Sequence, residues 1–321
     1  MKLVRGDQLL KRHPENPIIV PSMLPGADTT YNCGQTMYNG KTILLVAIDW
    51  VKGGRMTGTA GNDEGANTET RVAESQDGVH FTFHDKPLMD FRGTYLERYT
   101  QRILDTRVTK IEDTYYICFP GQGGFGPCGV LVRTKDFEKV EPMGIIALPP
   151  NRVPCLFPEK IGGRYCRIDR PGHTPGGPGD LWISYSPDLL YWGDHRFLTT
   201  SYTRWTRTKM GPTPPIKTNE GWLVIIHGVQ TPCSGNVYRL GALLLDLDDP
   251  TKIIGRTRSW ILAPTEPYEI MGNVLNVVFA CGAIADHEQD RLRVYYGCAD
   301  TSIALATCRL SDLIAMCIEE A

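Results

Sequence analysis

Residues 106–119, TRVTKIEDTYYICF, place two runs that alternate apolar and polar side chains on either side of a short acidic turn. Alternation with a period of two, bounded by turn residues, is typical of a β-hairpin with one buried face. The same strand, turn and strand pattern recurs in four further segments of the chain: residues 34–48, 156–168, 214–228 and 281–297. The chain therefore predicts repeated β-hairpins.

Each hairpin is followed by a further strand-like segment that ends in an acidic turn. These turns read ESQDG, RTKDF, YSPDL, DLDDP and RLSDL, at residues 74–78, 133–137, 185–189, 246–250 and 309–313. A β-sandwich with similar hairpins is the alternative, but five matching units favour one blade per unit. We expect an all-β, five-bladed propeller that forms a single domain over residues 1–321. Only residues 311–320, SDLIAMCIEE, have helical periodicity after a Ser cap, and they predict a short C-terminal helix.

Bulk composition excludes several classes of protein. Hydrophobic residues make up 41% of the 321 positions, enough for a large core, and the formal net charge is only −2. That charge gives no indication of a nucleic-acid partner or an anionic membrane surface. No apolar run approaches the roughly 18 residues of a membrane span. The charged N-terminus MKLVRGDQLLKRHPENP has no apolar signal region, so we expect a cytoplasmic protein.

The ten cysteines and seven histidines show no metal-binding pattern. No pair of cysteines has CxxC spacing, and most lie among apolar strand residues, which predicts buried, reduced thiols. The histidines lack paired ligand spacing, so we expect neither a metal nor another cofactor.

Two inserts stand apart from the strands. Residues 53–70 read as a surface loop, and the Pro/Gly-rich residues 171–179 as a turn beside a site.

One carboxylate and four basic residues are spread over separate strand-like segments. The carboxylate is Asp105, and the basic residues are Arg152, Arg170, Lys209 and His227. Taken singly, Asp105 could cap a turn and the arginines could be solvated surface residues. Taken together, a lone acid facing several cations suits an enzyme that protonates a leaving group and holds an anionic nucleophile.

From about residue 16 to residue 306 the chain resembles glycoside hydrolase family 130, the mannoside phosphorylases. The resemblance is carried by DTRVTKIEDTYYI at 105–117, LFPEKIGGRY at 156–165, GDLWISYSPDLLYWGDHRF at 179–197 and IKTNEGWLVIIHGV at 216–229. It implies a five-bladed propeller, in agreement with the repeats. It also implies cleavage of β-mannosidic bonds by inorganic phosphate, with inversion and release of α-mannose 1-phosphate.

The resemblance also implies roles for individual residues. Asp105, in DTR, matches the Asp of the family's DPR motif, the sole catalytic acid, which protonates the glycosidic oxygen through the mannose 3-hydroxyl. One acid suffices because phosphate arrives as an anion and needs positioning, whereas an inverting hydrolase needs a second carboxylate. The implied phosphate ligands are Arg152, Arg170, Lys209, His227 and Tyr238. The implied sugar ligands are Asn32, Arg107, His173, Asp180 and Asp300.

Three positions depart from the family pattern: Thr106 replaces the Pro of DPR, Ala47 stands where a sugar-binding Arg is usual, and Val153 replaces an Asn. The first departure loosens the turn at Asp105, and the second concerns the site of the transferred sugar. The basic residues that match the phosphate pocket are all present. Their presence argues against the hydrolytic branch of the family.

The expected function is phosphorolysis of 4-O-β-mannosyl-glucose or of short β-1,4-mannooligosaccharides. The partners are then a β-mannoside and phosphate, without nucleic acid or membrane, and a homo-oligomer is left open. Two alternatives remain at this point. One is an inverting β-mannosidase with Glu159 or Glu112 as base, and the other a non-catalytic propeller that binds manno-oligosaccharides.

Overall fold

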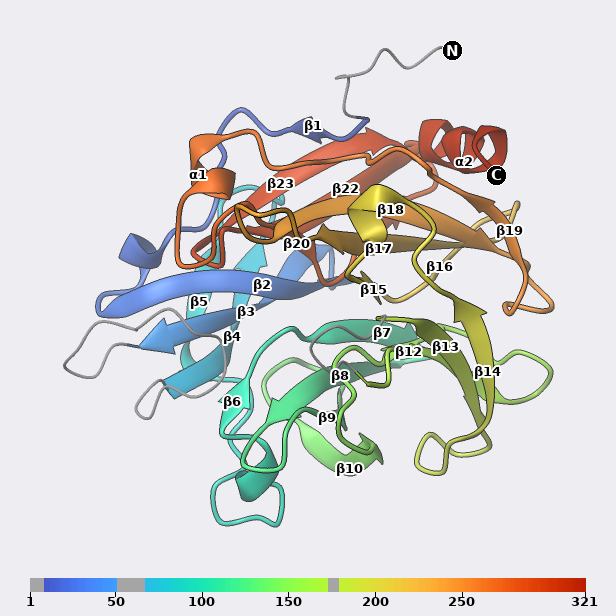
Figure 1. Ribbon diagram of the computed structural model, residues 1–321. Coiled ribbons are helices and arrows are strands. Elements are labelled where there is room, and N and C mark those ends of the chain that lie inside the picture. Colours follow the sequence, from blue (N-terminus) through green and yellow to red (C-terminus); the bar gives the residue numbers. More distant parts are fainter. Residues whose placement is uncertain (1–8, 51–66, 173–178) are drawn as a thin grey trace.

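The computed structural model describes residues 9–50, 67–172 and 179–321, and its described part consists mainly of antiparallel strands (Figure 1). The first two meanders share one nine-stranded sheet. The first meander comprises β2 (Ala27–Tyr38), β3 (Lys41–Trp50), β4 (Asn67–Ser75) and β5 (Thr82–Pro87). The second comprises β6 (Arg102–Ile103), β7 (Arg107–Ile111), β8 (Thr114–Gln122), β9 (Cys128–Thr134) and β10 (Glu141–Ala147). A parallel bridge between Thr68 and Arg102 joins the two meanders.

Three more sheets follow along the chain. The third meander contains β11 (Cys155–Leu156), β12 (Tyr165–Asp169), β13 (Leu181–Ser186) and β14 (Gly193–Thr199). The fourth contains β15 (Lys209–Pro212), β16 (Ile216–Lys217), β17 (Trp222–Gln230), β18 (Val237–Leu245) and β19 (Ile253–Arg256). The fifth contains β20 (Val278–Ala280), β21 (Ile284–Asp286), β22 (Arg291–Cys298) and β23 (Ser302–Arg309), with β1 (Lys11–Arg12) at its edge.

All five predicted hairpins are present as antiparallel strand pairs, namely β2–β3, β7–β8, β11–β12, β16–β17 and β21–β22. The turn between β2 and β3 shows why the sequence encodes them. Asn39 and Gly40 form a two-residue loop with φ of 49° and 77°. Positive φ at both positions matches the right-handed twist of the flanking strands. The prediction of an all-β fold is therefore confirmed.

In four meanders an acidic turn follows the strand that comes after the hairpin, namely β4, β9, β13 and β18. The carboxylates of Asp77, Asp136, Asp188 and Asp246 each accept backbone N–H bonds from the residues two and three positions on. The fifth segment, RLSDL, differs because it leads from β23 into α2 (Leu310–Glu319). The predicted Ser cap of this helix is wrong. The carboxylate of Asp290 takes its place, accepting from the N–H and the hydroxyl of Ser311 at 2.8 and 2.6 Å.

The remaining short elements are the helix α1 (Pro267–Ile270) and three 3-10 turns, Pro21–Met23, Glu97–Tyr99 and Arg204–Thr206. Sequence periodicity could not predict α1, because four residues make hardly more than one helical turn. The predicted loop at residues 53–70 is wrong for 67–70, which belong to β4, and residues 53–66 lie outside the described ranges. Across residues 9–50, 67–172 and 179–321, no helix is long and apolar enough to cross a membrane.

Apolar side chains from neighbouring meanders form the core. One large cluster packs β17 and β18 against β22, β23 and α2, and includes Leu240, Val294 and Leu313. Another joins the first meander to the last through Val46, Tyr295 and Ile303. Figure 1 shows this arrangement, with the red β23 above the blue β2. The sheets are separate, so the closed five-bladed ring stays a prediction.

The N-terminal segment is held by the last meander. β1 pairs with β23, with Lys11 opposite Thr307 and Arg12 opposite Ala306. The guanidinium of Arg12 donates to both carboxylate oxygens of Glu269 at 2.8 and 2.7 Å. Glu269 is fully buried and also accepts from the hydroxyl of Tyr296 at 2.8 Å. The N-terminal segment is therefore joined to the last meander by backbone pairing and by an ion pair whose carboxylate is buried.

Candidate active site

A cavity of about 350 Å³ is lined by residues from all five meanders. Eight of the residues predicted for the site lie in its wall: Asn32, Asp105, Arg152, Arg170, Lys209, His227, Tyr238 and Asp300. They are as much as 268 positions apart in sequence (300 − 32), and separate sheets bring them together. The fold therefore assembles most of the predicted set in a single place.

The carboxyl group of Asp105 is held in a strained, buried position just before β7. Its backbone has φ of 52°, in the left-handed region that most residues avoid, and 9% of its surface is exposed. The amide of Asn32 donates to its Oδ1 at 2.7 Å, and Arg107 Nη1 donates to its main-chain oxygen. Asn32 has φ of 39° at a bulge in β2. Such outliers occur where a site fixes a functional side chain.

Thr106 replaces the fixed proline turn with hydrogen bonds. Its hydroxyl donates to the carbonyl of Leu45 at 3.2 Å and accepts from the N–H of Gly34 at 3.1 Å. A Cβ at position 34 would lie 2.7 Å from that hydroxyl oxygen, so this approach requires glycine. The loosening expected from the loss of proline is therefore offset by contacts to β2 and β3.

The basic cluster, defined as Arg152, Arg170, Lys209 and His227, lines the cavity from the third and fourth meanders and the segment that leads into them. Burial and the charges of neighbouring arginines together lower the pKa of Arg170 to about 10 and that of Lys209 to about 8. Within the described chain no ion pair joins Arg152, Arg170 or Lys209 to a carboxylate. Buried cations without a counter-ion are unfavourable. This part of the cavity is therefore suited to an anion.

His227 is a neutral hydrogen-bond donor in this cluster. Burial and the charge of Arg170 lower its pKa well below the usual 6.5. Its Nε2 lies 3.4 Å from Arg170 Nη1 and must accept, because a guanidinium only donates. The proton then sits on Nδ1, which has no partner among the described residues. Arg152 Nε and Arg170 Nε are likewise buried without a partner there.

Neighbouring strands set the geometry of the cluster. Lys209 and Tyr238 both pair with Val229, from opposite sides of β17. The Lys209 ammonium lies 5.2 Å from the centre of the Tyr238 ring. A Cβ at Gly211, the β15 partner of His227, would lie 2.1 Å from the imidazole Cε1. Glycine at 211 therefore leaves the room that the His227 ring occupies.

Asp300 lies in the β22–β23 turn with φ of 47°, and burial raises the pKa of its carboxyl group from 3.8 to about 7. The charges of Asp105 and Asp49 act in the same direction. The sequence suggested that Asp105 is a lone acid. In the structure it is not, because Asp49 and Asp300 also line the cavity. The raised pKa favours the protonated form of Asp300, which can donate as well as accept a hydrogen bond.

We expect Asp300→Asn to stabilise the protein at alkaline pH. A carboxyl whose folded pKa lies above its unfolded value binds its proton more tightly in the folded state. Its stability contribution is thus present below pH 4 and lost as pH rises through about 7. Asn removes this loss and tolerates positive φ. In urea unfolding, the free energy of unfolding of the variant should exceed that of wild type by about 2–4 kcal/mol at pH 8, and by less at pH 5. An equal shift at both pH values would contradict the expectation, and Asp113→Asn, an exposed turn residue, is the control.

Two described residues that were predicted to bind the sugar, Arg107 and Asp180, are not found in the cavity wall, and the prediction for a third falls outside the described residues. Arg107 is 1% exposed and contacts Cys281 Sγ at 3.1 Å, behind Asp105. Asp180 is not among the residues that line the cavity. His173, with most of the loop 171–179, lies outside the described residues. Of the departures, Val153 lines the cavity, and Ala47 packs with Tyr31 and Leu104.

The sequence did not indicate several polar or aromatic residues of the wall: Tyr31, Asp49, Arg102, Gln122, Asn236, Asn273 and Phe279. Arg102 and Gln122 face each other across β6 and β8, and the Phe279 ring lies 4.3 Å from that of His227. One sequence signal could have indicated two of them: Tyr31 directly precedes Asn32, and Arg102 lies three positions before Asp105.

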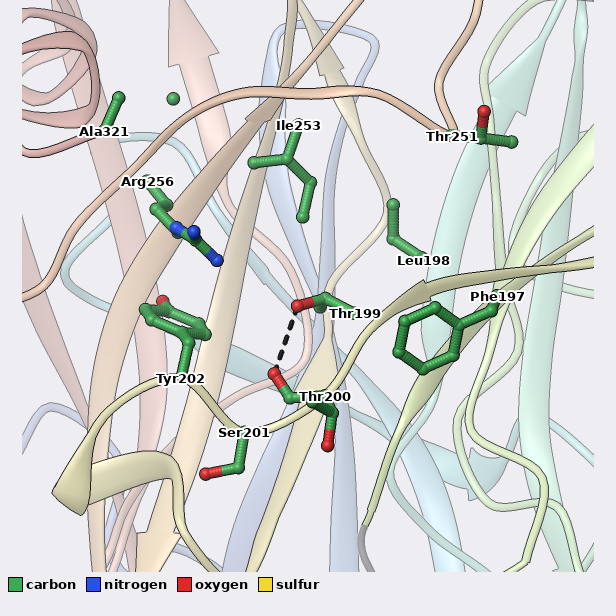
Figure 2. Close-up of a pocket in the computed structure, with 11 residues that line it drawn as sticks. Phe197, Leu198, Thr199, Thr200, Ser201, Tyr202, Thr251, Ile253, Arg256 and Ala321 are labelled. Atoms are coloured by element: carbon green, nitrogen blue, oxygen red, sulfur yellow. Dashed lines mark hydrogen bonds between the residues drawn. The ribbon is translucent and has the colours of Figure 1, made fainter.

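A second pocket, of about 320 Å³, lies between β14 and β19 and shares no residue with the cavity (Figure 2). Figure 2 shows Arg256 above the ring of Tyr202, at 4.9 Å, and the Thr199 hydroxyl bonded to the Thr200 carbonyl at 3.0 Å. Its described lining includes no Asp or Glu side chain. In the described part of the chain, no group of His, Cys, Asp and Glu could hold a metal ion.

Comparisons with known proteins agree with this geometry. A family model, Glyco_hydro_130, described as beta-1,4-mannooligosaccharide phosphorylase, matches residues 10–319. A beta-1,4-mannooligosaccharide phosphorylase from Ruminococcus albus is 34% identical over 94% of this chain and 89% of its own. A beta-1,2-mannobiose phosphorylase from Listeria innocua is 44% identical over 76% of this chain and 67% of its own. The solved structure of a Listeria innocua beta-1,2-mannobiose phosphorylase in complex with beta-1,2-mannobiose has a TM-score of 0.86 at 35% identity, covering 97% of this chain and 99% of that one. The chain therefore belongs to glycoside hydrolase family 130, a family of enzymes.

Proposed function

We propose that this enzyme catalyses the inverting phosphorolysis of β-mannosides, giving α-D-mannose 1-phosphate. The observation that carries the proposal is the basic cluster, whose three cations have no carboxylate ion pair within the described chain. The arginines offer forked donors, Lys209 a point charge and His227 a neutral N–H donor, and phosphate oxygens suit all three. Tyr238 stands beside Lys209 as a further ligand.

In the proposed reaction, a phosphate oxygen forms a bond to the anomeric carbon while the bond from that carbon to the glycosidic oxygen breaks. The proton of Asp105 passes to the departing oxygen, directly or through a sugar hydroxyl. Asp105 regains a proton from the bound hydrogenphosphate, so the net transfer is from phosphate to the departing sugar. The Asn32 amide holds Asp105 Oδ1 and leaves the other oxygen to carry the proton. Asp300 offers hydrogen bonds to sugar hydroxyls.

Turnover should require phosphate. Without phosphate the basic cluster holds no nucleophile, and none of its residues can act as the base that water needs. Sugar release from a β-mannoside should be negligible in phosphate-free buffer and restored by phosphate, with mannose 1-phosphate as the product. Detection of that product by ³¹P NMR checks the prediction. Mannose set free at the same rate without phosphate would exclude phosphorolysis.

The two alternatives are less well supported. The bases imagined for a hydrolase lie elsewhere: Glu159 is exposed and paired with Lys217 at 2.5 Å, and Glu112 is exposed in the β7–β8 turn. In a hydrolase another carboxylate of the cavity, such as Asp300, would have to act as base, and release of mannose without phosphate would reveal it. A non-catalytic binding protein would bind manno-oligosaccharides without producing mannose 1-phosphate in the same experiment.

The linkage has two candidates. The Ruminococcus albus relative and the family model favour short β-1,4-mannooligosaccharides, a class that the sequence predicted together with mannosyl-glucose. The likeness to the beta-1,2-mannobiose phosphorylase over nearly the whole of both chains favours β-1,2-mannobiose. A panel of β-1,2- and β-1,4-linked disaccharides, compared by kcat/KM with phosphate present, separates them. We further propose that residues 1–321 form one catalytic domain, a five-bladed propeller.

A further inference from the structure

The cavity wall contributed by the first two meanders carries a polar network that the predicted site did not include. Arg102 Nε donates to the Thr68 hydroxyl at 2.7 Å, and Arg102 Nη2 lies 3.6 Å from Asp49 Oδ1. The same Oδ1 accepts from Thr68 at 2.5 Å and from the Tyr31 hydroxyl at 3.3 Å. Tyr31, Asp49 and Arg102 all line the cavity.

The network borders two carboxylates that also act on the basic cluster. Burial raises the pKa of Tyr31, and among the charges that raise it are those of Asp49, Asp300 and Asp105. The charges of Asp105 and Asp300 also act on Lys209 of the basic cluster. Asp105 and Asp300 are therefore within electrostatic range of both groups of residues, and all of them line one cavity.

The network is suited to a neutral polyhydroxyl ligand. Arg102 and Asp49 balance each other's charge, so this wall holds no surplus charge for an anion, unlike the basic cluster. Both still have unused hydrogen-bonding groups: within the described chain, Asp49 Oδ2 has no partner, and Arg102 donates to Thr68 and Tyr31 through Nε and Nη2, which leaves Nη1. A guanidinium with a spare N–H donor hydrogen-bonds sugar hydroxyls well.

The surroundings supply an apolar face beside these donors. Tyr31 packs with Ala47 and Leu104, and both Tyr31 and Leu104 line the cavity. Tyr31 and Asp49 are only 4% and 1% exposed, as fully buried as Arg170 and His227 at 4% and 1%. In the proposed reaction the transferred sugar contacts both Asp105 and the bound phosphate. The network borders Asp105 in the same cavity, so it is placed to contact that sugar.

We propose that Arg102 is a specificity-determining residue that donates hydrogen bonds to hydroxyl groups of the transferred sugar, and that Asp49 and Thr68 are the residues that position it. The inference rests on the proposed phosphorolysis. In this arrangement β6, from the second meander, supplies the cation at a wall that is otherwise formed by β2 and β3. The parallel bridge between Thr68 and Arg102 fixes β6 at that wall.

Arg102→Met tests the proposal in the synthetic direction, from α-mannose 1-phosphate and an acceptor sugar. The KM for mannose 1-phosphate should rise roughly 10- to 100-fold, the loss expected for a charge-assisted hydrogen bond. The KM for the acceptor, and that for inorganic phosphate in the forward direction, should stay within about threefold. Arg98→Met is the matched control, because Arg98 is exposed in the same segment and does not line the cavity. A rise confined to the acceptor KM would overturn the assignment.

A purely structural role for Arg102 gives a different result. If Arg102 only joined the first two meanders, Arg102→Met would lower the melting temperature and leave both sugar KM values unchanged. Thr68→Val, which removes the hydroxyl bonded to Nε but keeps the guanidinium, should raise the mannose 1-phosphate KM less than Arg102→Met does. If the wild-type enzyme forms no mannose 1-phosphate, the proposed function fails. Calorimetric titration of mannose into wild type and Arg102→Met then still tests the contact, and equal affinities would refute it.

Discussion

Asp105→Asn is expected to lower kcat for phosphorolysis by 10²- to 10⁴-fold while leaving the fold intact. A positioned acid contributes about that factor, and a sugar alcohol is a poor leaving group without protonation. Asparagine suits the test because Asp105 has φ of 52°, and Asn tolerates this region better than Ala does. The amide oxygen can also still accept from Asn32, so the loss reports on the missing proton.

Steady-state kinetics and a thermal melt of the same preparation check this expectation. Asp113→Asn makes the same chemical change in the exposed β7–β8 turn and should leave both measurements unchanged. An aryl mannoside with an acidic leaving group should recover part of the lost rate, because it depends less on protonation. If Asp105→Asn retained wild-type rates on natural mannosides, Asp300 would become the candidate acid.

Arg170→Met should raise the phosphate KM by roughly 10- to 100-fold, with a smaller effect on the mannoside KM. A charge-assisted hydrogen bond to a buried anion contributes roughly 1.5–3 kcal/mol. Arg170 is 4% exposed, and its Nη1 donates to the Met210 carbonyl at 2.9 Å. Methionine keeps much of the side-chain volume, so the change removes the charge without opening a large cavity.

The melting temperature of the Arg170→Met variant distinguishes a phosphate-binding role of Arg170 from a purely structural one. In the phosphate-free protein Arg170 is buried beside Arg152, and this environment lowers its pKa to about 10. Removing one of two neighbouring buried cations should leave the phosphate-free melting temperature unchanged or raise it. Phosphate should stabilise wild type but not the variant. Arg164→Met, an exposed arginine on the same meander, is the control. A large drop in melting temperature with unchanged phosphate KM would remove Arg170 from the site.

Local patterns predicted the strands well because each hairpin carries its own turn chemistry. Asn39–Gly40 and the acidic turns encode their geometry within a few residues. The four-residue helix α1 and the Asp290 cap of α2 were missed because they depend on contacts between distant segments. A turn that caps a helix 20 residues later leaves no periodic signal.

The site was predicted unevenly for the same reason. The basic cluster and Asp105 were found through motifs shared with a family, and the fold brings them to one cavity. Arg102 and Asp49 were missed, since alone each looks like an ordinary charged strand residue, and their pairing exists only where β6 meets β4. Arg107 shows the opposite case, because it shares a motif with Asp105 yet points behind it.

The pairing of β1 with β23 has a consequence for biosynthesis. Lys11 leaves the ribosome early, but its partner Thr307 is 296 positions later in the chain (307 − 11). At translation rates of about 5–20 residues per second, β1 waits on the order of 15–60 seconds for its neighbour. During that interval the nascent chain has an unpaired edge and an Arg12 side chain without Glu269. The protein can complete its last sheet only after nearly all of it has been synthesised, so nascent chains are the form most exposed to aggregation and to chaperones.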